Sequence, residues 1–202
     1  MTDAASDRAI DPTIDAVTHP MRVAVLGWGA IGRIVGEALL EGQVPGARLV
    51  AVAAKQGTED CPVSVVAPER LADDADLVVE AAGQEALAAH GESYLRAGAQ
   101  LLVVSVGALV DDELFDRLRA AGGRRLHLTS GAIGGLDLLR AAGRAGPIDH
   151  LTLTTTKQPA SLLQDWMDDE MTAALRAGVD RVVTFDGPAA EAVSRFPQSV
   201  NV

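Results

Sequence analysis

The sequence is poor in cysteine and in basic residues, and each shortage excludes a class of protein. Cys61 is the single cysteine among 202 residues, so the chain can form neither an intrachain disulfide nor a cysteine-based zinc site. Lys and Arg number 17 against 28 Asp and Glu, which gives a net charge of −11. Nucleic acids and anionic membrane surfaces are bound by clustered cations, so we expect neither as a partner.

Long apolar stretches are also missing. No run reaches the roughly 18 consecutive apolar residues of a transmembrane helix. Residues 1–20 lack the basic and apolar regions of a signal peptide. We expect these residues to form a disordered leader before a first strand that starts at Met21. A lone cysteine fits a reducing compartment, and the chain is expected to be cytoplasmic.

The sequence is instead rich in short apolar runs that alternate with helical patterns. The run at 22–26 ends at Gly27 and is typical of a buried parallel strand. Alternation of strands and helices predicts an α/β fold with a doubly wound parallel sheet. The expected strands are 22–26, 49–52, 76–80 and 101–104, and the expected helices lie at about 31–39, 84–97 and 111–121.

The pattern changes after Gly123, and we expect a second, substrate-facing α+β domain there. The predicted boundaries are a leader at 1–20, a first domain at 21–123 and the second domain at 124–202. Leu and Thr alternate along 151–156, as in a strand with one buried face. Further expected elements are two strands, at 126–128 and 181–185, and two helices, one that ends near 142 and one that spans 188–195.

The segment GWGAIG carries the spacing Gly27-x-Gly29-x-x-Gly32, with a strand before it and a helix after it. This context is that of a dinucleotide-binding turn. Gly27 would allow the tight turn, Gly29 the approach of a pyrophosphate, and Gly32 close packing of helix on strand. Backbone N–H groups around Ala30 and Ile31 would then face the phosphates. The alternative is a plain strand–helix turn that binds nothing.

The residues after the second strand bear on the choice between NAD and NADP. An acidic residue at this point usually binds the ribose of NAD, but the chain reads AAKQG at 53–57 and has no carboxylate before Glu59. Lys55 could attract the 2′-phosphate of NADP. The alternative is that Lys55 is a solvated loop residue, so both NAD and NADP remain candidate cofactors.

Three segments follow the ends of expected strands, where ligands bind in parallel sheets: VEAAG at 79–83, SVGAL at 105–109 and SGAIGGLD at 130–137. Together with TKQP at 156–159, FDGPAAEAV at 185–193 and FPQSVNV at 196–202, they make the chain resemble the L-aspartate dehydrogenase family. The resemblance covers essentially all of residues 21–202. SGAIGGLD speaks against the related semialdehyde and homoserine dehydrogenases.

The resemblance implies a Rossmann domain followed by an α+β domain for substrate binding and dimerisation, the latter incomplete in this chain. It implies a homodimer that oxidises L-aspartate to iminoaspartate with NAD or NADP. The imine would feed pyridine-nucleotide biosynthesis or hydrolyse to oxaloacetate and ammonia. The nicotinamide pocket would be lined by Ala81, Ser105, Gly107, Ala108, Ala132 and Asn201.

For the substrate, the resemblance implies contacts from Ser130, Gly131 and Lys157. Gln158 replaces a proline of the family's pattern, and a surface lysine is an equal alternative for Lys157.

The catalytic base is not identified within the chain. An amine that loses a proton needs a group that titrates near neutrality, most simply His, and the family's His would lie beyond Val202. We expect structural or surface roles for the four histidines present and a solvated segment, not a metal site, at 165–170. The alternative function is therefore an NAD(P)-binding relative or fragment without activity. The histidines concerned are His19, His90, His127 and His150.

Overall fold

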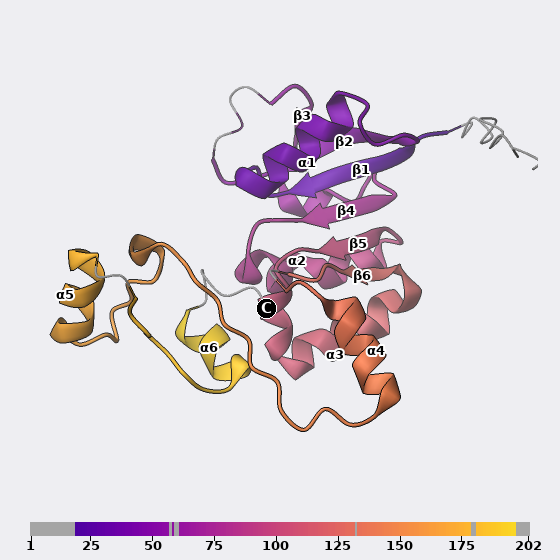
Figure 1. The fold of residues 1–202 in the computed structure, drawn as a ribbon. Coiled ribbons are helices and arrows are strands. Elements are labelled where there is room, and N and C mark those ends of the chain that lie inside the picture. The colour runs from indigo at the N-terminus through magenta and orange to yellow at the C-terminus, as the bar shows by residue number, and fades with distance from the viewer. Residues whose placement is uncertain (1–18, 57, 59–60, 132, 179–180, 197–202) are drawn as a thin grey trace, which may run out of the picture.

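The structure is a computed structural model that describes residues 19–56, 58, 61–131, 133–178 and 181–196. Its centre is a parallel sheet of six strands in the order β3-β2-β1-β4-β5-β6 (Figure 1). The predicted doubly wound α/β fold is thereby confirmed. The strands are β1 (Met21–Leu26), β2 (Ala47–Ala53), β3 (Ser64–Val65), β4 (Leu77–Glu80), β5 (Gln100–Val103) and β6 (Leu126–Leu128).

Helices connect the strands and continue beyond the sheet. The strand order runs outward from β1 in one direction and from β4 in the other, so it reverses between these two strands. Short 3₁₀ turns punctuate the loops: η1 (Pro68–Arg70), η2 (Val106–Val110), η3 (Gly123–Arg125) and η4 (Pro159–Ser161). The α-helices are α1 (Ala30–Leu40), α2 (Gln84–Arg96), α3 (Asp112–Gly122), α4 (Leu136–Ala145), α5 (Asp169–Ala177) and α6 (Ala189–Arg195).

One face of the sheet packs against α2 and α3. Successive side chains of a strand point to opposite faces, and Ala24 and Leu26 of β1 point to this one. The Tyr94 side chain is buried there, and its hydroxyl donates a hydrogen bond of 2.8 Å to the Pro68 carbonyl. Burial raises the pKa of the Tyr94 hydroxyl. The fully buried members of this layer include Val78, Leu87, Leu95, Leu101, Val103 and Leu118.

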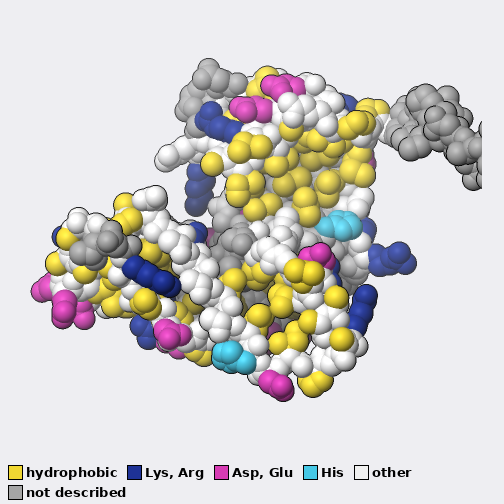
Figure 2. Space-filling model, in the orientation of Figure 1, with side chains coloured by type: hydrophobic (Ala, Val, Ile, Leu, Met, Phe, Trp, Pro, Cys, Tyr) yellow, Lys and Arg dark blue, Asp and Glu magenta, His cyan; other side chains and the backbone are white. Residues whose placement is uncertain are grey.

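On the opposite face, α1 packs over β1 and β2, with Val23 and Val25 beneath it. Trp28, from the turn between β1 and α1, is 8% exposed and lies over Gly36 of α1. A Cβ at Gly36 would collide with the indole ring, so this helix–turn contact requires glycine. Hydrophobic side chains also gather on this face near β1 and β4 (Figure 2), where Leu77 and Leu102 are only partly buried.

An ion pair joins the start of β1 to the residue before β4. The Arg22 guanidinium donates to both carboxylate oxygens of Asp76, at 2.8 and 3.3 Å, and the Arg22 backbone N–H adds a third bond of 2.8 Å. These hydrogen bonds from Arg22 lower the pKa of Asp76 to about 2. The pair fixes the edge of the sheet opposite to the glycine turn.

The two strands expected at 151–156 and 181–185 do not form, and this prediction is wrong for the structure described. Neither segment forms regular secondary structure, and within the described chain neither pairs with another strand. Period-two patterning selects an extended backbone, but a strand also needs a partner for its N–H and C=O groups. Leu151 and Leu153 are consequently 61% and 47% exposed.

The remaining helices agree with the sequence or refine it. The helix expected to end near 142 is present as α4, and the helix expected at 188–195 is present as α6. The acidic run at 165–170 leads into α5, where the Asp168 carboxylate caps the helix by accepting a bond of 2.7 Å from the Met171 N–H. No helix in the described part of the chain combines the length and apolarity that crossing a bilayer requires.

The predicted division at 123/124 stays a prediction. β6 lies just beyond it and pairs with β5, so the parallel sheet continues to Leu128.

Candidate functional site

The candidate site lies where the strand order reverses, at the carboxyl ends of β1 and β4. In a parallel sheet, a crevice opens at this point because the loops on its two sides run in opposite directions. The loop after β1 carries the predicted glycine turn, and the loops after β4 and β5 carry Ala81 and Ser105. The structure thus places segments from three parts of the sequence at one edge of the sheet (Figure 1).

Gly27 makes a turn that only glycine tolerates. Its φ is +97°, and an added Cβ would lie 2.5 Å from the Ala81 carbonyl oxygen and 2.8 Å from Ala82 Cα. Its N–H donates a hydrogen bond of 2.7 Å to the Ala53 carbonyl at the end of β2. The loop after β1 is therefore pressed against the loop after β4 and tied to β2.

Gly32 and Gly29 meet different surroundings. A Cβ at Gly32 would collide with the Gly27 carbonyl oxygen, so the absence of a side chain lets α1 pack directly on the turn. Gly29, which precedes α1, has no neighbouring atom within 4 Å of its Cβ position, and Gly29, Ala30 and Ile31 are all exposed. The first turn of α1 contains no acidic residue. The first N–H groups of a helix lack intrahelical acceptors, so this end suits an anion.

Lys55 follows β2 by two residues and is exposed at the same edge of the sheet. Its position beside the glycine turn is compatible with a contact to the ribose end of a dinucleotide. Glu59, the first carboxylate after it, lies outside the described residues, as do Ala132 and Asn201, which were expected near the nicotinamide.

Glu80 is a site residue that sequence reasoning missed. Its side chain is fully buried at the end of β4, and its carboxylate accepts hydrogen bonds from the N–H groups of Ala82 and Gly83 at 2.9 and 3.0 Å. Ser105 donates to it twice, from its N–H at 3.0 Å and from its hydroxyl at 2.9 Å. An acidic residue that ends an apolar strand was the available signal in the sequence.

Gly107 and Ala108 are buried in η2, and Ala108 is 7% exposed. They line a small cavity of about 300 Å³ between the start of α2, the start of α3, and Val193 and Ser194 of α6. Both residues belong to η2, which directly follows Ser105 in the chain, and α6 packs against this turn.

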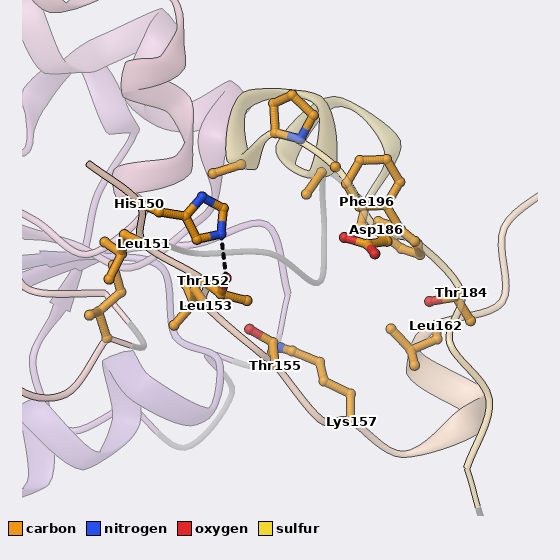
Figure 3. Close-up of a pocket in the computed structure, with 16 residues that line it drawn as sticks. His150, Leu151, Thr152, Leu153, Thr155, Lys157, Leu162, Thr184, Asp186 and Phe196 are labelled. Carbon is orange, nitrogen blue, oxygen red and sulfur yellow. Dashed lines mark hydrogen bonds between the residues drawn. The ribbon is translucent and has the colours of Figure 1, made fainter. Parts of the chain in front are cut away.

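A larger cavity of about 600 Å³ lies in the second half of the chain (Figure 3). The segments around 150–157 and 184–188 form its walls, together with α6 and Ile133. Its charged and titratable lining residues are His150, Lys157 and Asp186. The other lining residues are apolar or carry hydroxyls, and they include Leu151, Leu153, Leu162, Phe185, Phe196, Thr152, Thr155 and Thr184.

Aromatic side chains support one wall of this cavity. The Trp166 and Phe196 rings meet edge to face with centroids 5.4 Å apart, and the Trp166 indole N–H donates a bond of 3.0 Å to the Arg195 carbonyl. The Arg195 guanidinium stacks over Trp166 and Phe185 at 5.0 and 5.4 Å. These contacts fix the end of α6 against the segment that precedes α5.

The predicted substrate residues are only partly brought together. Lys157 is half-buried and lines the cavity. Ser130 and Gly131 follow β6 at the sheet edge, and the Gly131 N–H donates a bond of 3.3 Å to the Thr129 hydroxyl. Ile133 lines the cavity, so the SGAIGGLD stretch leads from the sheet edge to it.

Among the described histidines, His150 alone lines the cavity, where its Nε2 hydrogen bonds with the Thr152 hydroxyl at 3.0 Å. His19 is exposed ahead of β1. His90 stacks on Tyr94 at a centroid distance of 6.2 Å, and the His127 ring bonds with the Gln100 amide oxygen at 2.8 Å. These contacts of His90 and His127 are compatible with the structural or surface roles expected of them, whereas the cavity position of His150 was not foreseen.

Two sequence families match the chain, one on each half. The family described as the NAD binding domain of homoserine dehydrogenase matches residues 27–127, which include the glycine turn and the loops after β4 and β5. The family described as the C-terminal part of aspartate dehydrogenase matches residues 137–202, which include all of the cavity residues except Ile133.

Individual proteins match over both halves. Aspartate dehydrogenase from Thermotoga maritima has a similar fold, with a TM-score of 0.59 and 23% identity over 91% of this chain and 71% of that one. L-aspartate dehydrogenase 2 of Bordetella bronchiseptica is 38% identical over 92% of this chain and 71% of its own length. L-aspartate dehydrogenase of Methanocaldococcus jannaschii is 34% identical over 90% and 71%. Identity of this extent along most of both chains shows that the protein belongs to the L-aspartate dehydrogenase family.

Proposed function

We propose that the protein is an NAD(P)-dependent L-aspartate dehydrogenase. The Cα hydrogen of L-aspartate leaves as a hydride, the amine loses a proton to a base, and the product is iminoaspartate, which water converts to oxaloacetate and ammonia. The observation that carries the proposal is the turn at Gly27 and Gly32, which leaves open space at Gly29 where the strand order reverses. The chain's membership of the L-aspartate dehydrogenase family indicates that the substrate is L-aspartate.

The turn fits the dinucleotide. Gly29 leaves room for a pyrophosphate above the first turn of α1, where backbone N–H groups and the helix dipole favour negative charge. Ala81 and Ser105 lie on the other side of the crevice, where the second half of the dinucleotide would be held. When bound, the oxidised nicotinamide supplies the hydride acceptor.

We propose that NADP is accepted as well as NAD. Lys55 is exposed at the end of β2, and a cation at this point attracts a 2′-phosphate. The sequence has no carboxylate between the end of β2 and Glu59 that would repel that phosphate.

The cavity provides one cation for an anionic substrate. L-aspartate carries two carboxylates. Among the described residues that line the cavity, Lys157 is the only lysine, and no arginine lines it. A half-buried ammonium interacts with a carboxylate more strongly than a fully solvated one does. We propose that Lys157 binds one substrate carboxylate, and that Ser130 and Gly131 contribute from the sheet edge.

A second candidate is an NAD(P)-binding protein of the same family without turnover. The favouring observation is that none of the four described histidines lies in the loops after β1, β4 or β5. This candidate predicts cofactor affinity and no aspartate-dependent reduction.

We further propose a cytoplasmic homodimer that contributes to pyridine-nucleotide biosynthesis. The exposed Leu151, Leu153 and Val183 support dimerisation through the second half of the chain, because apolar side chains of this size favour burial against a partner. The mass in solution tests this, and a monomer at micromolar concentration would refute it.

The experiment that separates the two functions measures absorbance at the reduced-nicotinamide band with purified protein, L-aspartate, and NAD or NADP in turn. The proposal predicts reduction that depends on L-aspartate and falls when Lys157 is replaced by alanine. Cofactor binding by titration without any reduction would favour the second candidate.

A further inference from the structure

Glu80 is the one charged side chain fully buried in the core of the described chain. Burying a carboxylate is costly unless hydrogen bonds replace its hydration. Glu80 has four such bonds, two from the loop after β4 and two from Ser105 after β5. One carboxylate therefore joins the two loops that border one side of the crevice.

We propose that Glu80 is a positioning residue for the nicotinamide half of the bound dinucleotide. This inference rests on the proposed function, because it assumes that a dinucleotide binds across the crevice. Glu80 holds Ser105 and the loop after β4 in their binding positions before the cofactor arrives. A loop that is already ordered loses less entropy on binding.

The strand order separates the two halves of the ligand. The glycine turn, α1 and Lys55 belong to β1 and β2, on the side that binds the adenosine and pyrophosphate groups. Ser105 follows β5, on the opposite side of the reversal point, where the nicotinamide remains to be held. A change confined to Ser105 should therefore affect the nicotinamide and spare the rest.

The substitution Glu80→Gln produces such a change. The Oε1 atom of Glu80 receives bonds from Ala82, Gly83 and the Ser105 hydroxyl, whereas Oε2 receives the Ser105 N–H. The glutamine oxygen keeps the three bonds at the Oε1 position, which leaves its NH₂ group facing the Ser105 N–H. Two donors then oppose each other, and the Ser105 backbone is released while the loop after β4 stays held.

The test compares the affinities of NADH and ADP-ribose, which lacks the nicotinamide, for wild type and Glu80→Gln. Loss of a hydrogen bond to a buried carboxylate predicts NADH binding about ten-fold weaker, with ADP-ribose binding changed less than about two-fold. Glu92→Gln is the matched control, because Glu92 lies on α2 in ion pairs with Arg96 and Arg117. It loses the same charge and should leave both affinities unchanged.

Equal weakening of both ligands by Glu80→Gln, or of neither, would overturn the inference. Wild-type protein that binds neither ligand would overturn the proposed function as well, so the two failures are distinguishable. Ser105→Ala removes one of the four bonds, and its effect on NADH affinity should be non-additive with that of Glu80→Gln, since both act on one network. Additive effects would contradict the inference.

Hydrogen exchange on the wild-type protein provides a test that needs no variant. The inference predicts that the amides of Ala82, Gly83 and Ser105 are protected without cofactor. Exchange of all three at the rate of an unstructured chain would overturn it.

Discussion

Gly27→Ala should destabilise the fold, whereas Gly29→Ala should weaken cofactor binding, although each substitution adds one methyl group to the same turn. At Gly27 the backbone φ of +97° is unfavourable for any residue with a Cβ, at a cost of about 1–3 kcal/mol. The added Cβ would also lie 2.5 Å from the Ala81 carbonyl oxygen. Backbone atoms must move to relieve that contact, at a further cost of about 1–3 kcal/mol.

The sum for Gly27→Ala is a loss of roughly 2–6 kcal/mol in the free energy of unfolding, a large share of the ~5–15 kcal/mol typical of a domain. Gly29 has a φ of −83° and open space around its Cβ position. Gly29→Ala should therefore change the free energy of unfolding by less than about 1 kcal/mol. Its methyl group nevertheless occupies the space that a pyrophosphate requires, and NADH affinity should fall at least about ten-fold.

Urea unfolding followed by circular dichroism measures the first quantity, and NADH titration measures the second. We expect lower stability for Gly27→Ala, and weaker NADH binding with normal stability for Gly29→Ala. If Gly29→Ala binds NADH as wild type does, the pyrophosphate does not lie on this turn. If Gly27→Ala is as stable as wild type, the close contact with Ala81 is not present in solution.

Three further predictions concern packing, pH and cofactor choice. Gly36→Ala should displace the Trp28 indole and cost about 1–3 kcal/mol, seen as a lower urea midpoint and a changed near-ultraviolet dichroism; an unchanged spectrum would contradict the packing. The pKa of Asp76 is lowered to about 2 from about 3.9 in an unfolded chain, so the stabilisation by Arg22 is complete above about pH 4 and declines as the pH falls towards 2. Because both side chains are about 40% exposed, we expect a small decline in urea midpoint that Asp76→Asn removes, and an identical pH profile for that variant would refute it. Lys55→Glu should weaken NADPH binding more than NADH binding, with Arg48→Glu on β2 as the charge-matched control; equal losses would show that Lys55 does not meet the 2′-phosphate.

The first half of the chain could be predicted from sequence because its signals are local. Apolar runs such as that of β1, helix periodicity and the glycine spacing each fall within one strand–turn–helix unit, and the observed elements β1, α1, β4 and α2 lie close to the expected ranges. Position at the sheet edge then follows from the parallel order of the strands.

The second half could not be predicted as well because its structure depends on partners. The Leu–Thr alternation at 151–156 predicts a strand, but the pattern carries no information on a neighbouring strand to pair with, and no strand forms there. The cavity brings His150 and Lys157 together with Asp186, which lies far along the chain. Sequence spacing carries no signal for such a contact.

Glu80 was missed for a similar reason. In the sequence it is a single acidic residue at the end of VVE, and its partner Ser105 is 25 positions away. Only the register of β4 beside β5 shows that the two meet.

Transfer of the hydride from L-aspartate to the nicotinamide can be followed directly with an isotope label. L-aspartate with deuterium at Cα is incubated with the protein and oxidised cofactor, and the reduced nicotinamide is analysed by mass spectrometry. We expect one deuterium in the reduced ring for each molecule of substrate oxidised. Bound cofactor with no deuterium transferred would contradict it, and the protein would then be a dinucleotide-binding relative without dehydrogenase activity.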